Sequence, residues 1–211
     1  MPPMQNPYAS NPFGGAAPGS PRARRGTITL IRGCMFSGKT GELLRRLHDT
    51  VPGVQKAFKH RADNRFVADA IVSHDGRQYP AMRVSSPSEM LSQILPLTKL
   101  VALDEAHFFD ASIVDVVCSL RSRMVDVILT ALDRSSWGRS FSVVEALMAV
   151  ADETLLRRAF CAKCGAMATM TQRKTPIVDG NLIGGAEDYE PRCERCWAPP
   201  PEEEPEFPWL A

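Results

Sequence analysis

The residues best suited to chemistry form one short stretch, Gly33-Cys-Met-Phe-Ser-Gly38-Lys39-Thr40. Two glycines with four residues between them let backbone N–H groups turn inward around phosphate oxygens. Lys39 can then reach the outer phosphates, and the Thr40 hydroxyl can hold Mg²⁺. The alternative is a glycine-rich turn followed by an unrelated lysine. If the stretch is a phosphate loop, its nucleotide contacts are Gly33, Cys34, Met35, Phe36, Ser37, Gly38, Lys39 and Thr40.

The segments on either side of this stretch decide between the two alternatives. Residues 27–31 are β-branched and apolar, which predicts a buried strand, and Leu43, Leu44 and Leu47 recur at helical spacing. A strand, a glycine loop and a helix in this order are the context that separates a phosphate loop from a chance match. The positive end of the helix dipole then points at the phosphates. The sequence therefore predicts a site for a nucleoside triphosphate.

A second candidate for chemistry is the acidic pair Asp104-Glu105. It directly follows residues 99–103, which are apolar from residue 100 onward. Strands of parallel sheets are buried on both faces, and ligands gather at their carboxyl ends. Asp104 is therefore expected near Mg²⁺, through a bound water. The alternative is a solvated acidic turn after a core strand.

Strands and helices are expected to alternate along the chain. The predicted strands are 27–31, 54–59, 70–73, 99–103 and 124–132, and the predicted helices are 39–49, 86–95, 111–120 and 141–151. This alternation indicates an α/β fold, a P-loop (RecA-like), mostly parallel and doubly wound sheet. A small zinc-ribbon domain with a protruding lasso is expected beside it.

That zinc ribbon is predicted from four of the six cysteines, which form the pairs Cys161-x-x-Cys164 and Cys193-x-x-Cys196. Each pair offers two thiolates, and four thiolates complete a tetrahedral Zn²⁺ site. The connection between the pairs is longer than the usual ~15–20 residues, so a loop must protrude. The alternative is a redox role for either pair, but two pairs in one small module favour structural zinc.

The composition limits the remaining classes of function. There are 25 lysine and arginine residues against 24 aspartate and glutamate residues, a net charge of +1, which does not favour nucleic-acid or membrane binding. No stretch approaches the ~18–20 apolar residues of a membrane span. The N-terminal segment lacks the apolar core of a signal peptide, so a cytoplasmic location is expected.

The expected regions are a disordered tail (1–25), a nucleotide-binding domain (26–157), a zinc-ribbon lasso domain (158–197) and a disordered, acidic, proline-rich tail (198–211).

Taken together, over about residues 26 to 197, these pieces resemble the zinc-containing (type II) family of thymidine kinases. The resemblance rests on the following motifs, which occur in unbroken order: the phosphate loop through Arg46, Lys59-x-x-x-Asp63-x-Arg65, Ser73-His-Asp-Gly76, Asp104-Glu-Ala-His-Phe-Phe109, Ala131-Leu-Asp133, Cys161-x-x-Cys164-Gly, Thr171-x-Arg173, Ile183-Gly-Gly185, Tyr189 and Cys193-x-x-Cys196.

The resemblance implies phosphoryl transfer from MgATP to the 5′-hydroxyl of thymidine or deoxyuridine. It assigns Glu105 as general base and places Arg65 beside the transferring phosphate. Asp63, Asp104 and His107 join the nucleotide-binding residues. The resemblance also implies structural zinc that fixes the ends of the lasso, a homotetramer and inhibition by thymidine triphosphate. The nucleoside is expected to contact Met35, Phe108, Phe141, Thr171, Asn181, Leu182, Ile183, Gly184 and Tyr189.

Two positions depart from the family pattern. The family usually has Gln where His107 stands, and histidine titrates near neutrality, so a hydrogen bond there could depend on pH. The family also carries an aromatic residue at the position of Ser136, packed near the base. Losing that ring removes a contact worth about 0.5–1.5 kcal/mol, unless Trp137 takes its place or the loop shifts its register by one residue.

Two other functions are compatible with the same motifs. The first is a nucleotide-binding relative of the family that regulates and has no kinase activity. The second is a zinc-ribbon ATPase that acts on nucleic acid, although the near-zero net charge counts against it.

Overall fold

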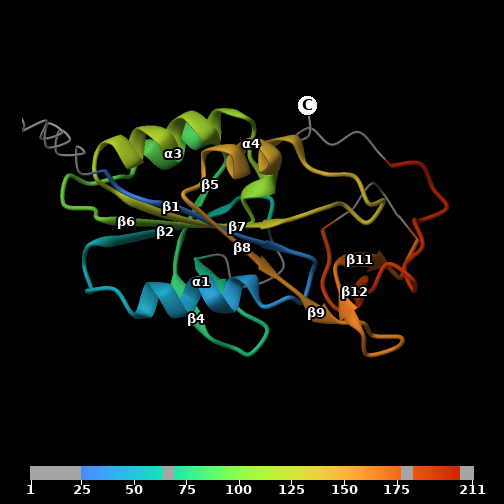
Figure 1. Cartoon of the computed structure of the whole chain (residues 1–211). Coiled ribbons are helices and arrows are strands. Elements are labelled where there is room, and N and C mark those ends of the chain that lie inside the picture. The colour runs from blue at the N-terminus through green and yellow to red at the C-terminus, as the bar shows by residue number, and fades with distance from the viewer. Residues whose placement is uncertain (1–24, 64–68, 177–182, 205–211) are drawn as a thin grey trace, which may run out of the picture.

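The computed structural model (Figure 1) describes residues 25–63, 69–176 and 183–204. Predictions made for Arg65, for Asn181 and Leu182, for residues 1–24 of the N-terminal tail and for residues 205–211 of the C-terminal tail lie outside the described residues. Arg25, the last residue of the predicted N-terminal tail, is described and forms a 2.9 Å ion pair with Asp152.

The centre of the molecule is a sheet of six parallel strands in the order β5-β2-β6-β7-β1-β8. The strands are β1 (Ile28–Gly33), β2 (Gln55–His60), β5 (Met82–Val84), β6 (Leu100–Asp104), β7 (Asp126–Leu132) and β8 (Glu153–Arg157). The predicted α/β fold with a parallel sheet is therefore confirmed. The edge strand β8 was not predicted, because its residues are mostly exposed and give no buried apolar run.

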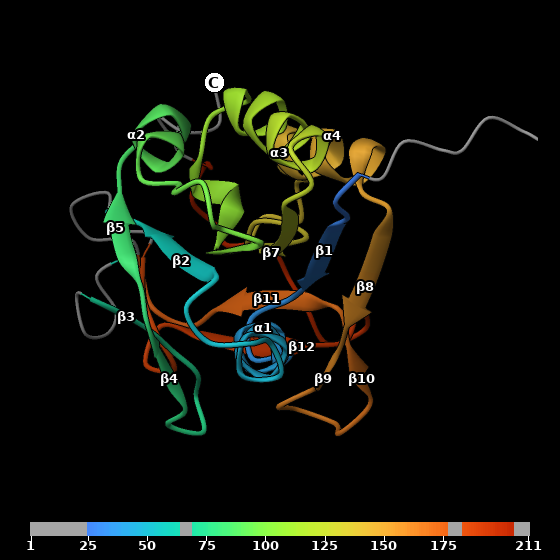
Figure 2. The same cartoon turned by 90° about the vertical axis from the view of Figure 1, so that its left-hand side faces the viewer.

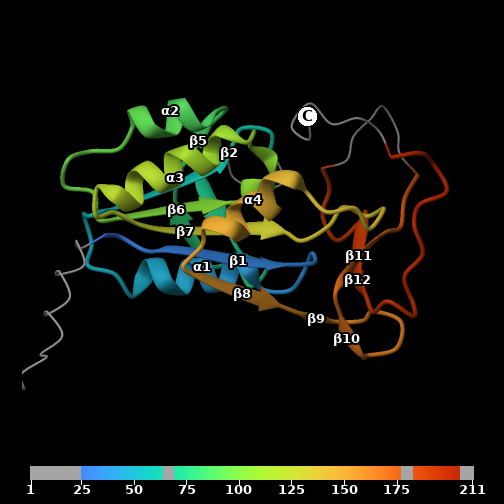
Figure 3. The same cartoon turned by 45° about the horizontal axis from the view of Figure 1, so that its top comes forward.

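Helices cover both faces of this sheet, as Figures 2 and 3 show. One face carries α2 (Pro87–Ser92), α3 (Ser112–Ser122) and α4 (Ser142–Val150), and its core includes Ile113, Val117 and Leu147. The other face carries α1 (Lys39–His48) and the hairpin of β3 (Ala70–Val72) and β4 (Gln78–Pro80). Within the three described ranges, no helix is long and apolar enough to cross a bilayer.

The helices begin and end for local reasons. Leu43, Leu44 and Leu47 of α1 are fully buried, as their spacing predicted. The Ser86 hydroxyl accepts the Glu89 N–H at 3.2 Å and caps α2, and Pro87 occupies its first turn. This helix ends at Ser92 rather than at residue 95, because the proline at position 96 disfavours helical backbone in the residue before it.

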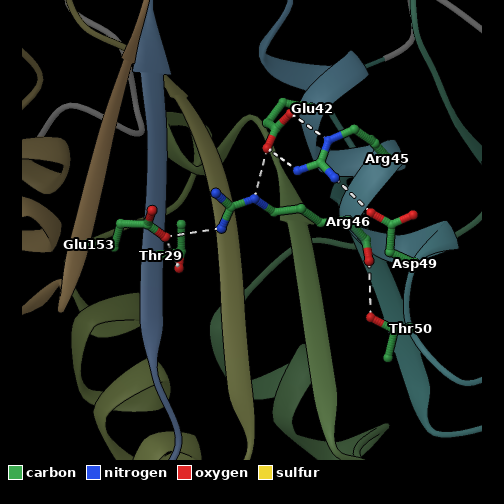
Figure 4. A network of polar contacts seen from close by, with 7 residues as sticks. All are labelled: Thr29, Glu42, Arg45, Arg46, Asp49, Thr50 and Glu153. Carbon is green, nitrogen blue, oxygen red and sulfur yellow. Dashed lines mark hydrogen bonds and ion pairs between the residues drawn. The ribbon is translucent and has the colours of Figure 1, made fainter.

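A cluster of charged residues joins α1 to the edge strand (Figure 4). Glu42 in the first turn of α1 accepts hydrogen bonds from Arg45 and Arg46 at 2.7 and 2.9 Å. Arg46 in turn pairs with Glu153 of β8 at 3.0 Å, and Glu153 accepts from Thr29 of β1. These pairs fix the helix that follows the phosphate loop against β1 and β8.

Residues 158–176 and 183–197, called the cysteine module here, form two short antiparallel ribbons. They contain β9 (Ala159–Phe160) with β10 (Met167–Ala168), and β11 (Met170–Arg173) with β12 (Tyr189–Arg192). Figure 3 shows the module beyond the carboxyl ends of β1, β7 and β8. This position places it next to the edge of the sheet where ligands of parallel sheets bind.

Residues 198–204, called the C-terminal segment here, lie against the rest of the protein. The indole Nε1 of Trp137 donates to the Glu202 carbonyl oxygen at 2.7 Å, and the Ala198 N–H donates to Gln172 Oε1 at 2.9 Å. Arg139 and Glu204 form an ion pair at 3.3 Å. The sequence assigned these residues to a disordered tail, whereas the structure packs them against the loop of residues 134–140. The partners that hold them are distant in sequence, which a composition-based prediction does not take into account.

Candidate active site

The phosphate loop connects β1 to α1 and depends on glycine at both ends. Gly33 has φ +152°, and a Cβ there would lie 2.2 Å from the Arg157 carbonyl oxygen of the neighbouring strand. Gly38 caps α1 in the left-handed conformation, with φ 78°. No other residue fits both positions without strain, so the glycine spacing in the sequence is explained by the backbone geometry.

Lys39 is buried at the start of α1. Its side chain reaches back to the beginning of the loop, where Nζ donates to the Cys34 carbonyl oxygen at 2.9 Å. The Cys34 side chain packs toward the cysteine module, with Sγ 3.6 Å from the Ala168 carbonyl oxygen. Burial raises the pKa of the Cys34 thiol, and the positive charge of Lys39 only partly offsets this effect. Cys34 is therefore a neutral packing residue rather than a thiolate nucleophile.

Thr40 and Asp104, which the sequence assigned separately to Mg²⁺, lie close together. The Thr40 hydroxyl at the start of α1 lies 3.3 Å from Asp104 Oδ1 and 3.4 Å from Oδ2, and Asp104 is the last residue of β6. Hydroxyl and carboxylate oxygens are the ligands that Mg²⁺ prefers. The donor set at this place fits a magnesium ion.

A cavity of about 410 Å³ opens over the phosphate loop. Its lining includes the buried Asp63 together with Asp104 and Glu105. Its remaining walls are residues 35–42, Arg45, Lys59, 70–75, Arg77 and Arg157. The lining includes five cationic side chains, Lys39, Arg45, Lys59, Arg77 and Arg157, and the start of α1 faces the same cavity, which suits a polyphosphate.

A smaller pocket of about 70 Å³ adjoins this cavity, and its walls are mainly apolar and aromatic. Ile183 and Gly184, which follow the part of the lasso outside the described residues, contribute to it. Its lining residues are Met35, Glu105, His107, Phe108, Leu132, Arg134, Ser135, Ser136, Trp137, Phe141, Thr171, Ile183, Gly184 and Tyr189. An aromatic pocket with a few polar groups suits a flat heterocycle.

Glu105 lines both the cavity and the pocket. It follows β6 directly, is only 5% exposed, and has left-handed backbone with φ 53° and ψ 52°. Left-handed backbone is uncommon for residues other than glycine and clusters at functional sites. This turn directs the Glu105 carboxylate to the boundary between the polar cavity and the aromatic pocket.

His107 lines the aromatic pocket rather than the phosphate cavity. Its Nδ1 accepts the Leu132 N–H at 3.3 Å, so a neutral ring carries its proton on Nε2. The ring lies 4.4 Å from the Phe108 ring and 5.0 Å from the Phe141 ring, centre to centre. Its Nδ1 also lies 3.5 Å from Glu105 Oε2, so His107 contacts both the aromatic wall and the Glu105 carboxylate. Its assignment to the nucleotide stays a prediction.

Trp137 also lines the pocket, together with Ser136. Ser136 has no aromatic ring to offer the pocket, but the next residue, Trp137, lines the pocket and carries an indole ring. Two indoles hold this loop: Trp137 donates to the Glu202 carbonyl oxygen at 2.7 Å, and Trp197 donates to the Ser136 carbonyl oxygen at 3.2 Å.

The four cysteines of the two pairs meet at one point. Their sulfur atoms all lie within 4.8 Å of one another, and Cys164 Sγ is 3.6 Å from Cys193 Sγ. Zn–S bonds of about 2.3 Å in a tetrahedron place sulfurs about 3.8 Å apart. Burial acts to raise the pKa of Cys161, but hydrogen bonds to the backbone, chiefly at Cys193 and Lys163, outweigh it and lower the pKa to about 6. The cluster is compatible with structural zinc.

The comparison with protein families agrees with this geometry. The model of the family described as thymidine kinase matches residues 26–197, which is most of the chain. The chain belongs to the thymidine kinase family. The four-cysteine cluster is consistent with the zinc-containing, type II branch of that family.

In this thymidine kinase family member, the structure brings most of the predicted site residues to one end of the sheet. Residues 35–40 of the phosphate loop line the larger cavity together with Asp63, Asp104 and Glu105, whereas Gly33 and Cys34 do not. The described nucleoside residues, Met35, Phe108, Phe141, Thr171, Ile183, Gly184 and Tyr189, line the smaller pocket. Which atoms each residue contacts in a bound substrate stays a prediction.

Several residues of this thymidine kinase site were not assigned to it from the sequence, although Lys59 and His74 lie in motifs of the resemblance. Lys59 is 2% exposed, lies beside Asp104 in the register of β2 and β6, and lines the larger cavity. A lysine directly after the buried Ala57 and Phe58 was the signal that could have identified it. His74, whose ring lies 4.8 Å from that of Phe36, and Arg157 of the edge strand also line that cavity. No local pattern marks Arg157, because its position depends on the pairing of β8 with β1.

Proposed function

We propose that this protein transfers the γ-phosphate of MgATP to the 5′-hydroxyl of thymidine or deoxyuridine. The membership of the chain in the thymidine kinase family supports a deoxynucleoside kinase in general. The choice of nucleoside and the role of each residue are our proposals.

The observation that carries this proposal is the position of Glu105. Its side chain borders both a cavity over a phosphate loop and an aromatic pocket. A kinase needs a carboxylate at this junction, because the reacting hydroxyl of the acceptor must meet the terminal phosphate of the donor there. Glu105 accepts the proton of the 5′-hydroxyl as that oxygen attacks the γ-phosphorus, and the bond to the bridging oxygen of ADP breaks.

The other residues on this side of the site bind and position the phosphates and the magnesium ion. The backbone N–H groups of the phosphate loop and Lys39 hold the β- and γ-phosphates. The Thr40 hydroxyl would hold Mg²⁺ and Asp104 would hold it through a bound water, and the ion when bound offsets negative charge on the phosphates. Arg65, outside the described residues, stays our candidate for a positive charge beside the transferring phosphate. Asp63 belongs to the nucleotide side of the site.

The aromatic pocket holds the base, and the lasso closes over it through Asn181, Leu182, Ile183 and Gly184. A zinc ion in the four-cysteine cluster fixes both ends of this lasso, so that binding has less chain to order. We further expect a homotetramer, which light scattering on the purified protein checks, and a cytoplasmic location, which fractionation of cells checks.

The test is a panel of the deoxynucleosides of thymine, uracil, cytosine, adenine and guanine with radiolabelled ATP and Mg²⁺. We expect labelled monophosphate from thymidine and deoxyuridine. Glu105→Gln should abolish turnover and leave binding of an ATP analogue intact. ATP binding without phosphorylation of any pyrimidine deoxynucleoside would instead indicate a regulatory relative. Salt-sensitive DNA binding would indicate the nucleic-acid ATPase.

A further inference from the structure

Thr130, which no sequence motif marked, lies behind the site and bonds both Asp104 and Glu105. It belongs to β7 and is completely buried. Two residues before it, Ile128 packs with the leucines of α1, and side chains two apart share one face of a strand. The register pairs Leu103 with Leu129, so that Thr130 comes next to Asp104, where β6 ends.

The Thr130 hydroxyl makes two hydrogen bonds of opposite direction. It accepts the backbone N–H of Glu105 at 2.9 Å and donates its proton to Asp104 Oδ1 at 2.5 Å. A hydroxyl has one proton and two lone pairs, so one side chain can make both bonds at once. Asp104 is the carboxylate that Thr40 approaches at 3.3 Å, and Glu105 is the residue with left-handed backbone.

We propose that Thr130 is a positioning residue that fixes Asp104 and Glu105 relative to each other. The inference rests on the proposed function, in which Asp104 belongs to the magnesium side and Glu105 to the nucleoside side. One hydroxyl holds the backbone turn that directs Glu105 and orients the carboxylate of Asp104. The group that binds the metal and the group that accepts the proton are thereby kept in register by a residue that touches neither substrate.

Removing the hydroxyl should affect both sides of the site. Thr130→Val keeps the shape of the side chain and leaves the buried Glu105 N–H and the Asp104 carboxylate without this partner. Misplacing a catalytic group by about 1 Å can cost a hundredfold in rate, so we expect kcat to fall by about ten- to a hundredfold. The KM for thymidine should change less than kcat because, of the described residues that line the aromatic pocket, the Thr130 hydroxyl bonds only Glu105.

The affinity of the site for a divalent metal ion can be measured independently of turnover. Hydrogen bonds to carboxylate ligands typically contribute about ten- to a hundredfold to metal affinity. We expect Thr130→Val to weaken Mn²⁺ binding to the complex with a non-hydrolysable ATP analogue by about tenfold, measured by electron paramagnetic resonance. Thr130→Ser, which restores the hydroxyl without the methyl group, should restore both kcat and Mn²⁺ binding.

Thr29→Val is the matched control, because Thr29 is also a buried threonine of the central sheet but bonds Glu153 at the edge. Thr130→Ala removes the same hydroxyl with a smaller side chain and replaces Thr130→Val if melting shows that variant unfolded. The inference is overturned if the Val variant matches Thr29→Val in kcat and Mn²⁺ binding, or if the Ser variant is as impaired as the Val variant.

These outcomes separate the inference from the proposed function. A wild-type protein that phosphorylates no deoxynucleoside removes the proposed function, and the Mn²⁺ measurements then decide the role of Thr130 at Asp104. A wild-type protein that is active, with unchanged Thr130 variants, keeps the proposed function and removes the inference.

Discussion

The backbone N–H of Met35 in the phosphate loop donates to Thr171 Oγ1 of the cysteine module at 3.1 Å. Both residues are buried, and both line the aromatic pocket. This hydrogen bond joins the loop that would hold the phosphates to the module that would hold the nucleoside. The contact of Cys34 Sγ with the Ala168 carbonyl oxygen at 3.6 Å strengthens the same junction.

Thr171→Val should therefore weaken substrate binding on both sides of the junction. The buried Met35 N–H would lose its partner, at a cost of about 1 kcal/mol or more. We expect KM for ATP and for thymidine each to rise by about fivefold, measured by steady-state kinetics. Thr171→Ser keeps the hydroxyl and should behave like the wild type. Equal KM values for the Val variant and the wild type would show that the junction does not contribute to binding.

Removal of the metal should affect the nucleoside more than the nucleotide. Without zinc the four cysteines no longer fix the ends of the lasso, and ordering a segment on binding costs about 2 kcal/mol or more. We expect kcat/KM for thymidine to fall by about thirtyfold after chelation. Binding of the ATP analogue should decrease less, because most residues of the phosphate cavity lie outside the module.

Zinc released per chain, measured with a colorimetric chelator, provides the check on this experiment. Zinc added back should restore activity. Full activity in a protein whose zinc has been completely released would contradict a role of the cluster in holding the lasso.

The C-terminal segment should contribute to the aromatic pocket. Trp137→Phe keeps an aromatic ring and removes the bond from the indole to the Glu202 carbonyl oxygen. A variant that ends at Ala198 removes the acceptor of the same bond, the Glu202 carbonyl oxygen. Since one hydrogen bond is worth about 1 kcal/mol, we expect about a fivefold higher KM for thymidine in either variant. Arg139→Gln instead removes the ion pair with Glu204, whose side chain is only 8% exposed, and so separates that contact of the segment from the Trp137 bond.

If loop 134–140 positions itself without the C-terminal segment, the shortened variant will match the wild type in KM. If only the shortened variant is impaired, a contact of the segment other than the Trp137–Glu202 bond positions the loop.

Glu42 should make the stability of the fold depend on pH. The hydrogen bond from Arg45 is the largest influence on its carboxylate, and with Arg46 it lowers the pKa from 4.5 to about 2 despite partial burial. Because the folded pKa lies below the unfolded value, this stabilisation is complete above about pH 4.5 and is lost as the pH falls toward 2. Discounting for solvent screening, Glu42→Gln should lower the free energy of unfolding by about 1 kcal/mol at pH 7.

Urea unfolding at several pH values measures this effect. Glu145→Gln is a matched control, since Glu145 also lies in the first turn of a helix and shares any effect of the helix dipole. The difference between Glu42→Gln and the wild type should shrink below pH 4.5. A difference that stays constant to pH 2.5 would show that packing, rather than the charge of Glu42, is responsible.

The amino-acid sequence by itself determined the features that depend on neighbours in the chain. The strand, the glycine loop and the leucines of α1 are one continuous stretch, so the periodicity and the glycine spacing were sufficient to predict them. The cap of α2 by Ser86 and the tight turns of the two cysteine pairs are equally local. Asp104 and Glu105 were predicted because a buried strand ends directly before them.

Only the tertiary structure decided how these pieces meet. The order of the strands places Thr130 beside Asp104 and Arg157 beside the phosphate loop, and no pattern within β7 or β8 indicates this. The contact of Trp137 with Glu202 joins residues 65 positions apart. Such contacts are set by which apolar faces pack together, and packing is a property of the whole chain rather than of any local segment.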